Sequence, residues 1–232
     1  MQDISKIGRK LGIGKRELEL AGFYKAKVNL SILERLKPGK KNRYILVSAI
    51  TPTPLGEGKT VTTIGLSMAL NRLKAKSIST LRQSSLGPLF GAKGMASGGG
   101  ASCVIPRDEI NIHFTGDTHA VGVANNLIVS FLENTIFHGN SLCIDPTTIN
   151  FRRCIDISDR SLRHINYALK SGQAKLDIKT GFEITAASEI MSILTLSSDL
   201  SDMRKRLGNI VVALSKDAKC VTASDIKADG MA

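Results

Sequence analysis

Aromatic residues are scarce in this sequence, and tryptophan is absent. Phe and Tyr make up 4% of the 232 residues, so a hydrophobic core must be built mainly from Ile, Leu, Val and Ala. Few rings are available to stack on nucleic-acid bases. The net charge of +12 leaves three explanations: nucleic acid, anionic small substrates or a compositional bias. Because the basic residues are spread along the chain, we expect small-molecule substrates, a largely solvated positive surface and no nucleic-acid partner.

Cysteine patterns and long apolar runs are also lacking. Cys103, Cys143, Cys154 and Cys220 form no C-x-x-C pair and have no His at zinc spacing, so they indicate neither a disulfide framework nor a metal site. No run of 18 apolar residues is present, which predicts no membrane span. The N-terminus has no apolar stretch of the kind that marks a signal peptide. We therefore expect a cytoplasmic protein.

The apolar pattern predicts alternating strands and helices. Strands are expected at 44–50, 77–82 and 209–214, and helices at 4–11 (capped by Asp3), 15–20, 60–73, 117–137 and 183–196. The run at 44–50 is apolar throughout, as in strands buried on both faces of a parallel sheet. We predict an α/β fold, specifically a P-loop NTPase-like layered fold with a mostly parallel sheet flanked by helices. A helical extension is expected at 1–42 and the α/β core at 43–232.

A candidate phosphate-binding loop follows the first expected strand. Gly58, Lys59 and Thr60 match the pattern G-x-x-x-x-G-K-[ST], while Thr53 stands where the first glycine belongs. Loop N–H groups and the positive end of a helix favour a bound phosphate. The candidate nucleotide-binding residues are Thr53, Pro54, Leu55, Gly56, Glu57, Gly58, Lys59 and Thr60. The alternative is an ordinary turn before a surface helix.

The same segment is more specific than the general pattern. Pro52-Thr-Pro-Leu-Gly-Glu-Gly-Lys59 resembles the signature of formate–tetrahydrofolate ligase, also called 10-formyltetrahydrofolate synthetase. Further blocks of the same family occur in the right order at 81–88, 90–94, 98–100, 111–120, 124–127, 151–163 and 182–191. The resemblance runs from about Ile4 to the last residue.

This resemblance implies an ATP-dependent ligation of formate to tetrahydrofolate through formyl phosphate, which gives 10-formyltetrahydrofolate. ATP and Mg²⁺ are the expected cofactors. Lys59 is expected at the terminal phosphates and Thr60 at Mg²⁺. Arg82 is the C-terminal residue of the strand expected at 77–82, beside a glycine-rich loop, where it is placed to hold formyl phosphate. A strand-end arginine is otherwise usually a surface salt-bridge partner.

Two histidines and a glycine-rich loop complete the expected site. His113 and His119 belong to a block that borders the active site in the family, as anion contacts or proton carriers. Structural hydrogen bonding is the alternative for both. Gly98, Gly99 and Gly100 are expected to let the backbone approach a substrate closely, or else to form a plain flexible loop.

Some residues depart from the family pattern. Ser84 stands where Pro is usual, Met95 and Ser97 where Gly and Ala are usual, and Arg107 where Met is common. Loss of the proline ring at 84 frees φ and loosens the placement of Arg82. These changes weigh against full catalytic competence.

Family members are typically more than twice as long as this chain. Their folate-stacking aromatics and adenine contacts lie in the half that is not present. Four alternatives therefore stay open: an active ligase, a non-catalytic remnant, one piece of a split ligase, or another P-loop ATPase. The segment from Gly208 onward is expected to expose apolar surface meant for the missing half, or to drive homo-oligomer formation.

Overall fold

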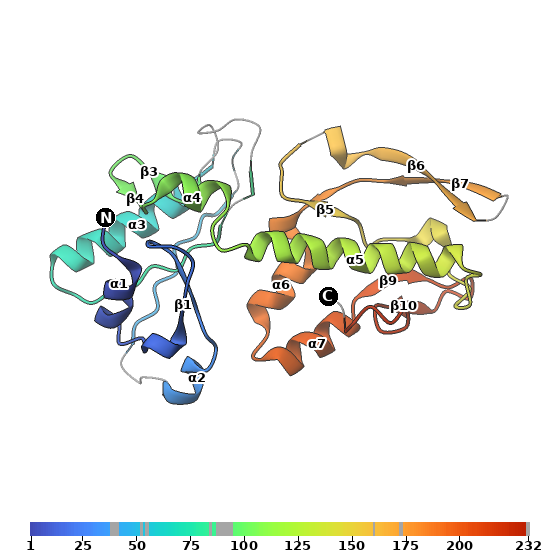
Figure 1. The fold of residues 1–232 in the computed structure, drawn as a ribbon. Coiled ribbons are helices and arrows are strands. Elements are labelled where there is room, and N and C mark those ends of the chain that lie inside the picture. The colour runs from blue at the N-terminus through green and yellow to red at the C-terminus, as the bar shows by residue number, and fades with distance from the viewer. Residues whose placement is uncertain are drawn as a thin grey trace. The chain divides into compact units, whose positions relative to one another are not determined.

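The computed structural model describes residues 1–37, 42–51, 53, 56–83, 85–86, 95–159, 161–171 and 174–230. The chain divides into two compact units (Figure 1). Unit 1 comprises Met1–Ser84 and Leu89–Gly116, and unit 2 comprises Ser85–Pro88 and Asp117–Ala232. Helices and strands occur in both, which agrees with the predicted α/β class.

Unit 1 begins with a short helix and a hairpin. The helix α1 (Ile4–Lys10) starts where predicted, because the Asp3 carboxylate accepts the Ser5 N–H at 2.7 Å. Strand β1 (Leu18–Leu20) pairs antiparallel with β2 (Ala26–Val28), and helix α2 (Ile32–Arg35) follows. The predicted helix at 15–20 is wrong: only a 3₁₀ turn, η1 (Lys15–Glu17), forms, because pairing with β2 draws the next residues into a strand.

The second half of unit 1 contains the candidate site. Helix α3 (Lys59–Arg72) confirms the helix predicted at 60–73. The short strands β3 (Gly98–Gly99) and β4 (Ser102–Cys103) pair antiparallel, and helix α4 (Arg107–Ile112) follows them. Ile64 of α3 is buried.

The strands predicted at 44–50 and 77–82 are not found. No strand is assigned in either run. Tyr44, Ile45, Leu46 and Ile50 are all exposed, as is Ile78 in the second run. A strand is stabilised by backbone bonds and side-chain pairs to a neighbouring strand, so an apolar run without one stays unpaired. The prediction of strands at 44–50 and 77–82 is therefore wrong for the described structure, in which neither run pairs with another strand.

Unit 2 is organised around the long helix α5 (Asp117–Phe137), whose bounds confirm the prediction. Helices α6 (Glu189–Leu196) and α7 (Leu200–Gly208) and the hairpin of β9 (Val211–Leu214) with β10 (Cys220–Thr222) enclose the core with it (Figure 1). The largest fully buried side chains of this core are Ile128, Leu132, Ile144, Ile210 and Val212.

Two further strand pairs complete unit 2. The hairpin of β6 (Ile165–Ser171) with β7 (Ala174–Thr180) is antiparallel and extends along α5 (Figure 1). Strand β5 (Cys154–Ile155) pairs parallel with β8 (Glu183–Ile184). Short 3₁₀ turns occur at η2 (Pro146–Thr148), η3 (Ser161–Arg163) and η4 (Thr185–Ala187).

Three predictions about unit 2 have different outcomes. Strand β9 confirms most of the strand expected at 209–214. The helix expected at 183–196 begins only at Glu189, because Ser188 caps it by accepting the Met191 N–H at 3.2 Å. The expectation of exposed apolar surface after Gly208 is wrong. Most of the apolar residues described there are buried, among them Ile210, Val212 and Val221, because the β9–β10 hairpin and the turn after it fold back onto the core.

Within the described residues the strands form five two-stranded sheets, and β5–β8 is the parallel one. The finer prediction of a mostly parallel P-loop-type sheet is therefore not confirmed. One helical stretch, Arg107–Phe137, is long and apolar enough to cross a membrane by length and composition. This is weak support for a membrane span, because apolar residues of α5 form the core of unit 2.

Candidate functional site

The first turn of α3 carries the predicted phosphate loop. Gly56 has a φ of 88° and Gly58, the N-cap residue, a φ of 74°. A side chain at either position would be strained whatever the available space, so the turn into α3 requires glycine. Pro54 and Leu55 lie outside the described residues. The Gly58 N-cap makes no side-chain cap hydrogen bond to the first turn of α3. The first N–H groups of any helix lack partners within the helix, so a helix N-terminus favours a bound anion.

The carboxylate of Glu57 is held inside this loop. It accepts hydrogen bonds from the Thr53 N–H and the Lys59 ammonium. The Lys59 bond, followed by the Thr53 bond, lowers the pKa of Glu57 from 4.5 to about 2. The loop therefore holds an oxyanion between a backbone N–H and a lysine at the start of a helix. A phosphate group would make the same contacts.

The glycine-rich loop lies against the same helix. A Cβ on Gly98 would come within 2.4 Å of the Ser102 carbonyl oxygen and 2.6 Å of Ile64 Cδ1 of α3. A Cβ on Gly99 would lie 3.7 Å from Val61 Cγ2, one residue after Thr60. Only glycine allows this close approach at 98. The structure thus places Gly98 and Gly99 in β3, beside the first two turns of α3, while Gly100 has a φ of 56° in the turn after it.

The remaining predicted residues occupy separate places. Arg82 is exposed in the segment after α3, where no helix or strand is assigned. His113 is the exposed C-cap of α4 in unit 1, and its N–H donates to the Glu109 carbonyl at 3.1 Å. His119 is exposed in the first turn of α5 in unit 2. The structure therefore brings together Glu57, Lys59 and the 98–100 loop, and assigns the two histidines to different units.

Unit 2 contains a second candidate site that the sequence did not predict. Its base is β5, which α5 holds through two asparagines. Asn126 pairs with both backbone groups of Cys154, at 2.9 and 3.0 Å, and Asn125 donates to the Arg152 carbonyl at 2.8 Å. On the other side, the Glu183 N–H donates to the Arg153 carbonyl at 2.8 Å. The backbone of 152–154 is thus fixed between a helix and a strand.

Adjacent arginines on this fixed backbone have different environments. Arg153 pairs with Glu133 of α5 through two hydrogen bonds, at 2.7 and 2.6 Å, and lies over the Tyr167 ring at 5.9 Å. Burial works to raise the pKa of Glu133, but bonds from Arg153 and Tyr167 outweigh it and hold that pKa below its ordinary value. Arg153 is therefore a structural residue. Arg152, next to it, is exposed.

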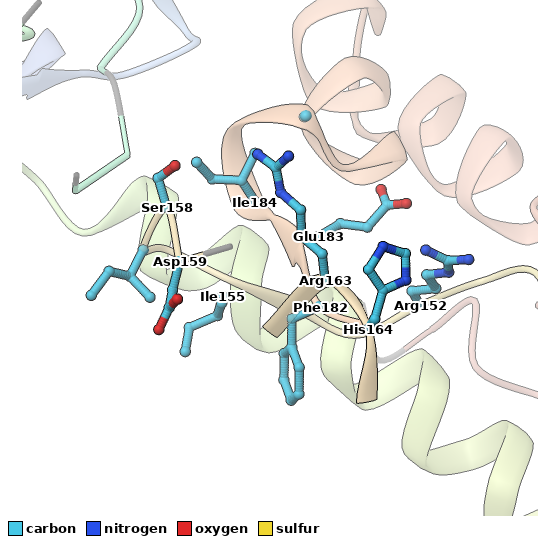
Figure 2. A pocket seen from close by; sticks show the side chains of 11 residues that line it. Arg152, Ile155, Ser158, Asp159, Arg163, His164, Phe182, Glu183 and Ile184 are labelled. Carbon is cyan, nitrogen blue, oxygen red and sulfur yellow. The ribbon is translucent and has the colours of Figure 1, made fainter. Parts of the chain in front are cut away.

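Arg152 lines a pocket of about 330 Å³ on unit 2 (Figure 2). The other basic lining residues are Arg163 and His164, and the wall includes Phe182, Ile184 and Glu183. Gly181 allows this arrangement, since a Cβ there would lie 2.0 Å from the Arg163 carbonyl oxygen. In the sequence, the two arginines appear only as an adjacent pair in the block 151–163. The sequence does not show which of them is paired, because the partner of Arg153, Glu133, lies 20 residues away in the chain.

Comparison with known proteins identifies the family. The family model described as formate–tetrahydrofolate ligase matches residues 1–232. The chain belongs to the formate–tetrahydrofolate ligase family. It is 50% identical over 230 residues to the formate–tetrahydrofolate ligase of Caldicellulosiruptor bescii, covering 99% of this chain and 42% of that protein. It is 54% identical over 233 residues to that of Thermosipho africanus, again with 99% and 42% coverage. The chain thus spans less than half the length of these ligases.

Proposed function

We propose that this chain is the ATP-binding, formate-activating part of a formate–tetrahydrofolate ligase. The observation that carries the proposal is the Glu57 carboxylate held by Lys59 and the Thr53 N–H at the start of α3. A carboxylate and a terminal phosphate are both oxyanions, so the contacts that hold one suit the other. The family membership supports ATP, formate and tetrahydrofolate as the reactants, with 10-formyltetrahydrofolate as the product, in one-carbon metabolism.

The reaction requires this part of the ligase to position formate and ATP and to neutralise the charge of the phosphates. Formate attacks the γ-phosphorus of ATP, which breaks the bond to the bridging oxygen and releases ADP. The amine of tetrahydrofolate then attacks the formyl carbon of formyl phosphate, and inorganic phosphate and a proton leave. Lys59 would neutralise the terminal phosphates, and Arg82 would hold formyl phosphate. Thr60 lies in the first turn of α3, and its hydroxyl oxygen would coordinate Mg²⁺ together with phosphate oxygens. His113 and His119 would serve as anion contacts or proton carriers.

The finer features of the fold belong to the same proposal. A strand at 44–50 leading into the loop and α3 would give the P-loop arrangement, with 77–82 beside it in a parallel sheet. Both runs are largely exposed and belong to no strand in the described structure, so their backbone is available for such pairing. The four cysteines, all free, fit a reducing cytoplasm.

Titration of ATP into the purified protein tests this proposal. Lys59→Ala should weaken ATP binding by about 2–3 kcal/mol, because a charge-assisted contact to phosphate is lost. Arg72→Ala is the matched control, since it removes one positive charge from the other end of α3. Equal affinity in the wild type and the Lys59→Ala variant would refute the phosphate loop. An equal loss in the Arg72→Ala variant would show unspecific attraction instead.

A further inference from the structure

A buried asparagine of α4 holds the segment that leads into the glycine loop. Asn111 is 8% exposed, and its side-chain oxygen accepts the Ser97 N–H at 3.0 Å. Its side-chain amide donates to the Met95 sulfur at 3.4 Å. A thioether is a weak acceptor, so the bond to Ser97 is the stronger of the two. Because Ser97 directly precedes Gly98, this bond fixes the point from which the glycine loop starts.

The glycine loop also rests against α3 (Figure 1). Gly98 has no room for a Cβ between the Ser102 carbonyl oxygen and Ile64 of α3. Gly65 of α3 allows a similar approach, because a Cβ there would lie 3.0 Å from Ser102 Oγ. Packing of this kind blocks movement of the loop toward α3, but it opposes movement away only through weak dispersion contacts. The hydrogen bond to Asn111 is directional, so it fixes the loop relative to α4.

Asn111 links the loop to a second predicted site residue. It belongs to α4, and His113 is the C-cap of the same helix. The loop and His113 are therefore held in one arrangement within unit 1. Loss of the Asn111 side chain would leave the buried Ser97 N–H without this acceptor, which costs free energy unless the backbone shifts to find another. A shift at Ser97 would displace the loop that follows it.

We propose that Asn111 is a positioning residue of the formate-activating site. It holds residues 98–100 beside the first turns of α3, so that their backbone can approach formate and the terminal phosphate of ATP. The inference rests on the proposed function, and Asn111 acts through Ser97 and the glycine loop rather than by contact with a substrate. Such support matters for the reaction, because a displacement of about 1 Å at a reacting group can lower the rate about 10²-fold.

Formate titration in the presence of a non-hydrolysable ATP analogue and Mg²⁺ tests the inference, with the amide NMR signals of residues 98–100 as the readout. These signals should shift in the wild type. Asn111→Ala should weaken formate binding about tenfold or more, because the loop is no longer held in place. The affinity for the ATP analogue should stay unchanged, because Lys59 is not altered. Equal formate affinity in the wild type and in Asn111→Ala overturns the proposal.

Two control variants separate positioning from general stability. Asn140→Ala removes a comparable clasp in unit 2, where the Asn140 side chain bonds to both backbone groups of Ile144 at 2.8 Å. It should lower the melting temperature without changing the formate affinity. Met95→Leu keeps the bond between Asn111 and Ser97 and should bind formate like the wild type. A loss in either control as large as that in Asn111→Ala would reduce Asn111 to a packing residue and contradict the proposal.

A further variant and a measurement on the wild type serve if Asn111→Ala does not fold. Asn111→Gln keeps the amide but places it one methylene farther from the backbone, so it should also weaken formate binding. In the unaltered protein the Ser97 amide hydrogen should exchange slowly with solvent, because it is bonded. Fast exchange at Ser97 would show that the bond does not persist in solution, which would refute the proposal whatever the variants do.

The result can be separated from the proposed function. If ATP binding depends on Lys59 but the signals of residues 98–100 do not respond to formate, this inference fails and the phosphate loop stands. If ATP does not bind, while formate still shifts those signals in a way that depends on Asn111, the proposed function fails and the role of Asn111 in holding the loop stands.

Discussion

At the scale of single residues, Glu57 shows that an acidic side chain can occupy the place of a ligand. Its carboxylate accepts hydrogen bonds from Lys59 and from the Thr53 N–H. If ATP binds at this loop as proposed, its phosphate must displace Glu57 from Lys59 before it can use the same contacts. The proposal therefore implies that the carboxylate and the phosphate compete for one position.

The competition predicts that Glu57→Gln tightens ATP binding. An exposed ion pair contributes about 0.2–1 kcal/mol, so its loss should improve the affinity by up to about fivefold. Glu34→Gln, which removes an exposed carboxylate from α2, is the control and should have little effect. Calorimetric titration of ATP into the three proteins measures the difference. Weaker binding by Glu57→Gln would mean that Glu57 contacts the nucleotide or its metal ion directly.

Ser97 is a second residue with a direct consequence. It is fully buried beside the glycine loop, and its hydroxyl makes no hydrogen bond to a described residue. Its backbone is well held, since the N–H donates to Asn111 at 3.0 Å and the carbonyl accepts from Val104 at 2.8 Å. The hydroxyl therefore costs desolvation without a compensating bond.

Ser97→Ala should accordingly raise the stability of the protein by about 1 kcal/mol, since it removes the unbonded hydroxyl and keeps the backbone bonds. Ser77→Ala is the matched control. The Ser77 hydroxyl accepts a hydrogen bond from the Asn71 amide at 2.8 Å, so its removal should lower the stability of the protein. Thermal unfolding of both variants checks the sign. A lower melting temperature for Ser97→Ala would show that its hydroxyl has a partner in the folded protein.

At the scale of elements, an ion pair between Glu17 and Arg35 connects the 3₁₀ turn η1 with helix α2. Glu17 accepts from Arg35 of α2 at 2.8 and 2.7 Å and from the Gly14 N–H at 2.6 Å. The Arg35 bonds, followed by the Gly14 bond, lower the pKa of Glu17 from 4.5 to about 2. Because the pKa in the folded protein is depressed, the ionised form stabilises this segment above about pH 4.5. That contribution is lost as the pH falls toward 2.

The pH dependence can be measured by NMR. The Glu17 carboxyl carbon and the amides of β1 and β2 should titrate together with a midpoint near 2. In Arg35→Gln the midpoint should move up toward 4.5, because the largest cause of the shift is gone. A wild-type midpoint already near 4.5 would show that the Glu17–Arg35 contact does not persist in solution.

The elements also show what the sequence could and could not predict. Helices α3 and α5 were predicted almost to the residue, because a helix satisfies its backbone bonds within its own segment. The runs at 44–50 and 77–82 have the composition of strands, but a strand needs a partner that a local pattern does not specify. Lys59 belongs to a local sequence motif, so the sequence predicts it as a site residue. Arg152 belongs to no such motif: what distinguishes it from Arg153 is the pairing of Arg153 with Glu133, which is distant in the sequence.

At the scale of the whole chain, apolar burial is uneven. The hydrophobic core cluster lies entirely in unit 2. Among the described residues of unit 1, the buried apolar side chains are Ile64, Ala96 and Ile110, whereas the run at 44–50 is largely exposed. Exposed apolar runs of this kind favour association with another polypeptide. We expect the part of the ligase that this chain does not span to provide their partner, with a second copy of this chain as the alternative.

Formation of 10-formyltetrahydrofolate from ATP, formate and tetrahydrofolate is therefore the decisive measurement. It should compare the chain alone with the chain mixed with the C-terminal remainder of the Caldicellulosiruptor bescii ligase. Holding the amine in line with the formyl carbon lowers the activation barrier, and in well-oriented reactions this effect reaches about 7–11 kcal/mol. We expect no appreciable product from the chain alone, product from the mixture, and none from a mixture with Lys59→Ala. Robust turnover by the chain alone, or by the Lys59→Ala mixture, would contradict a formate-activating part that depends on Lys59 and on the rest of the ligase.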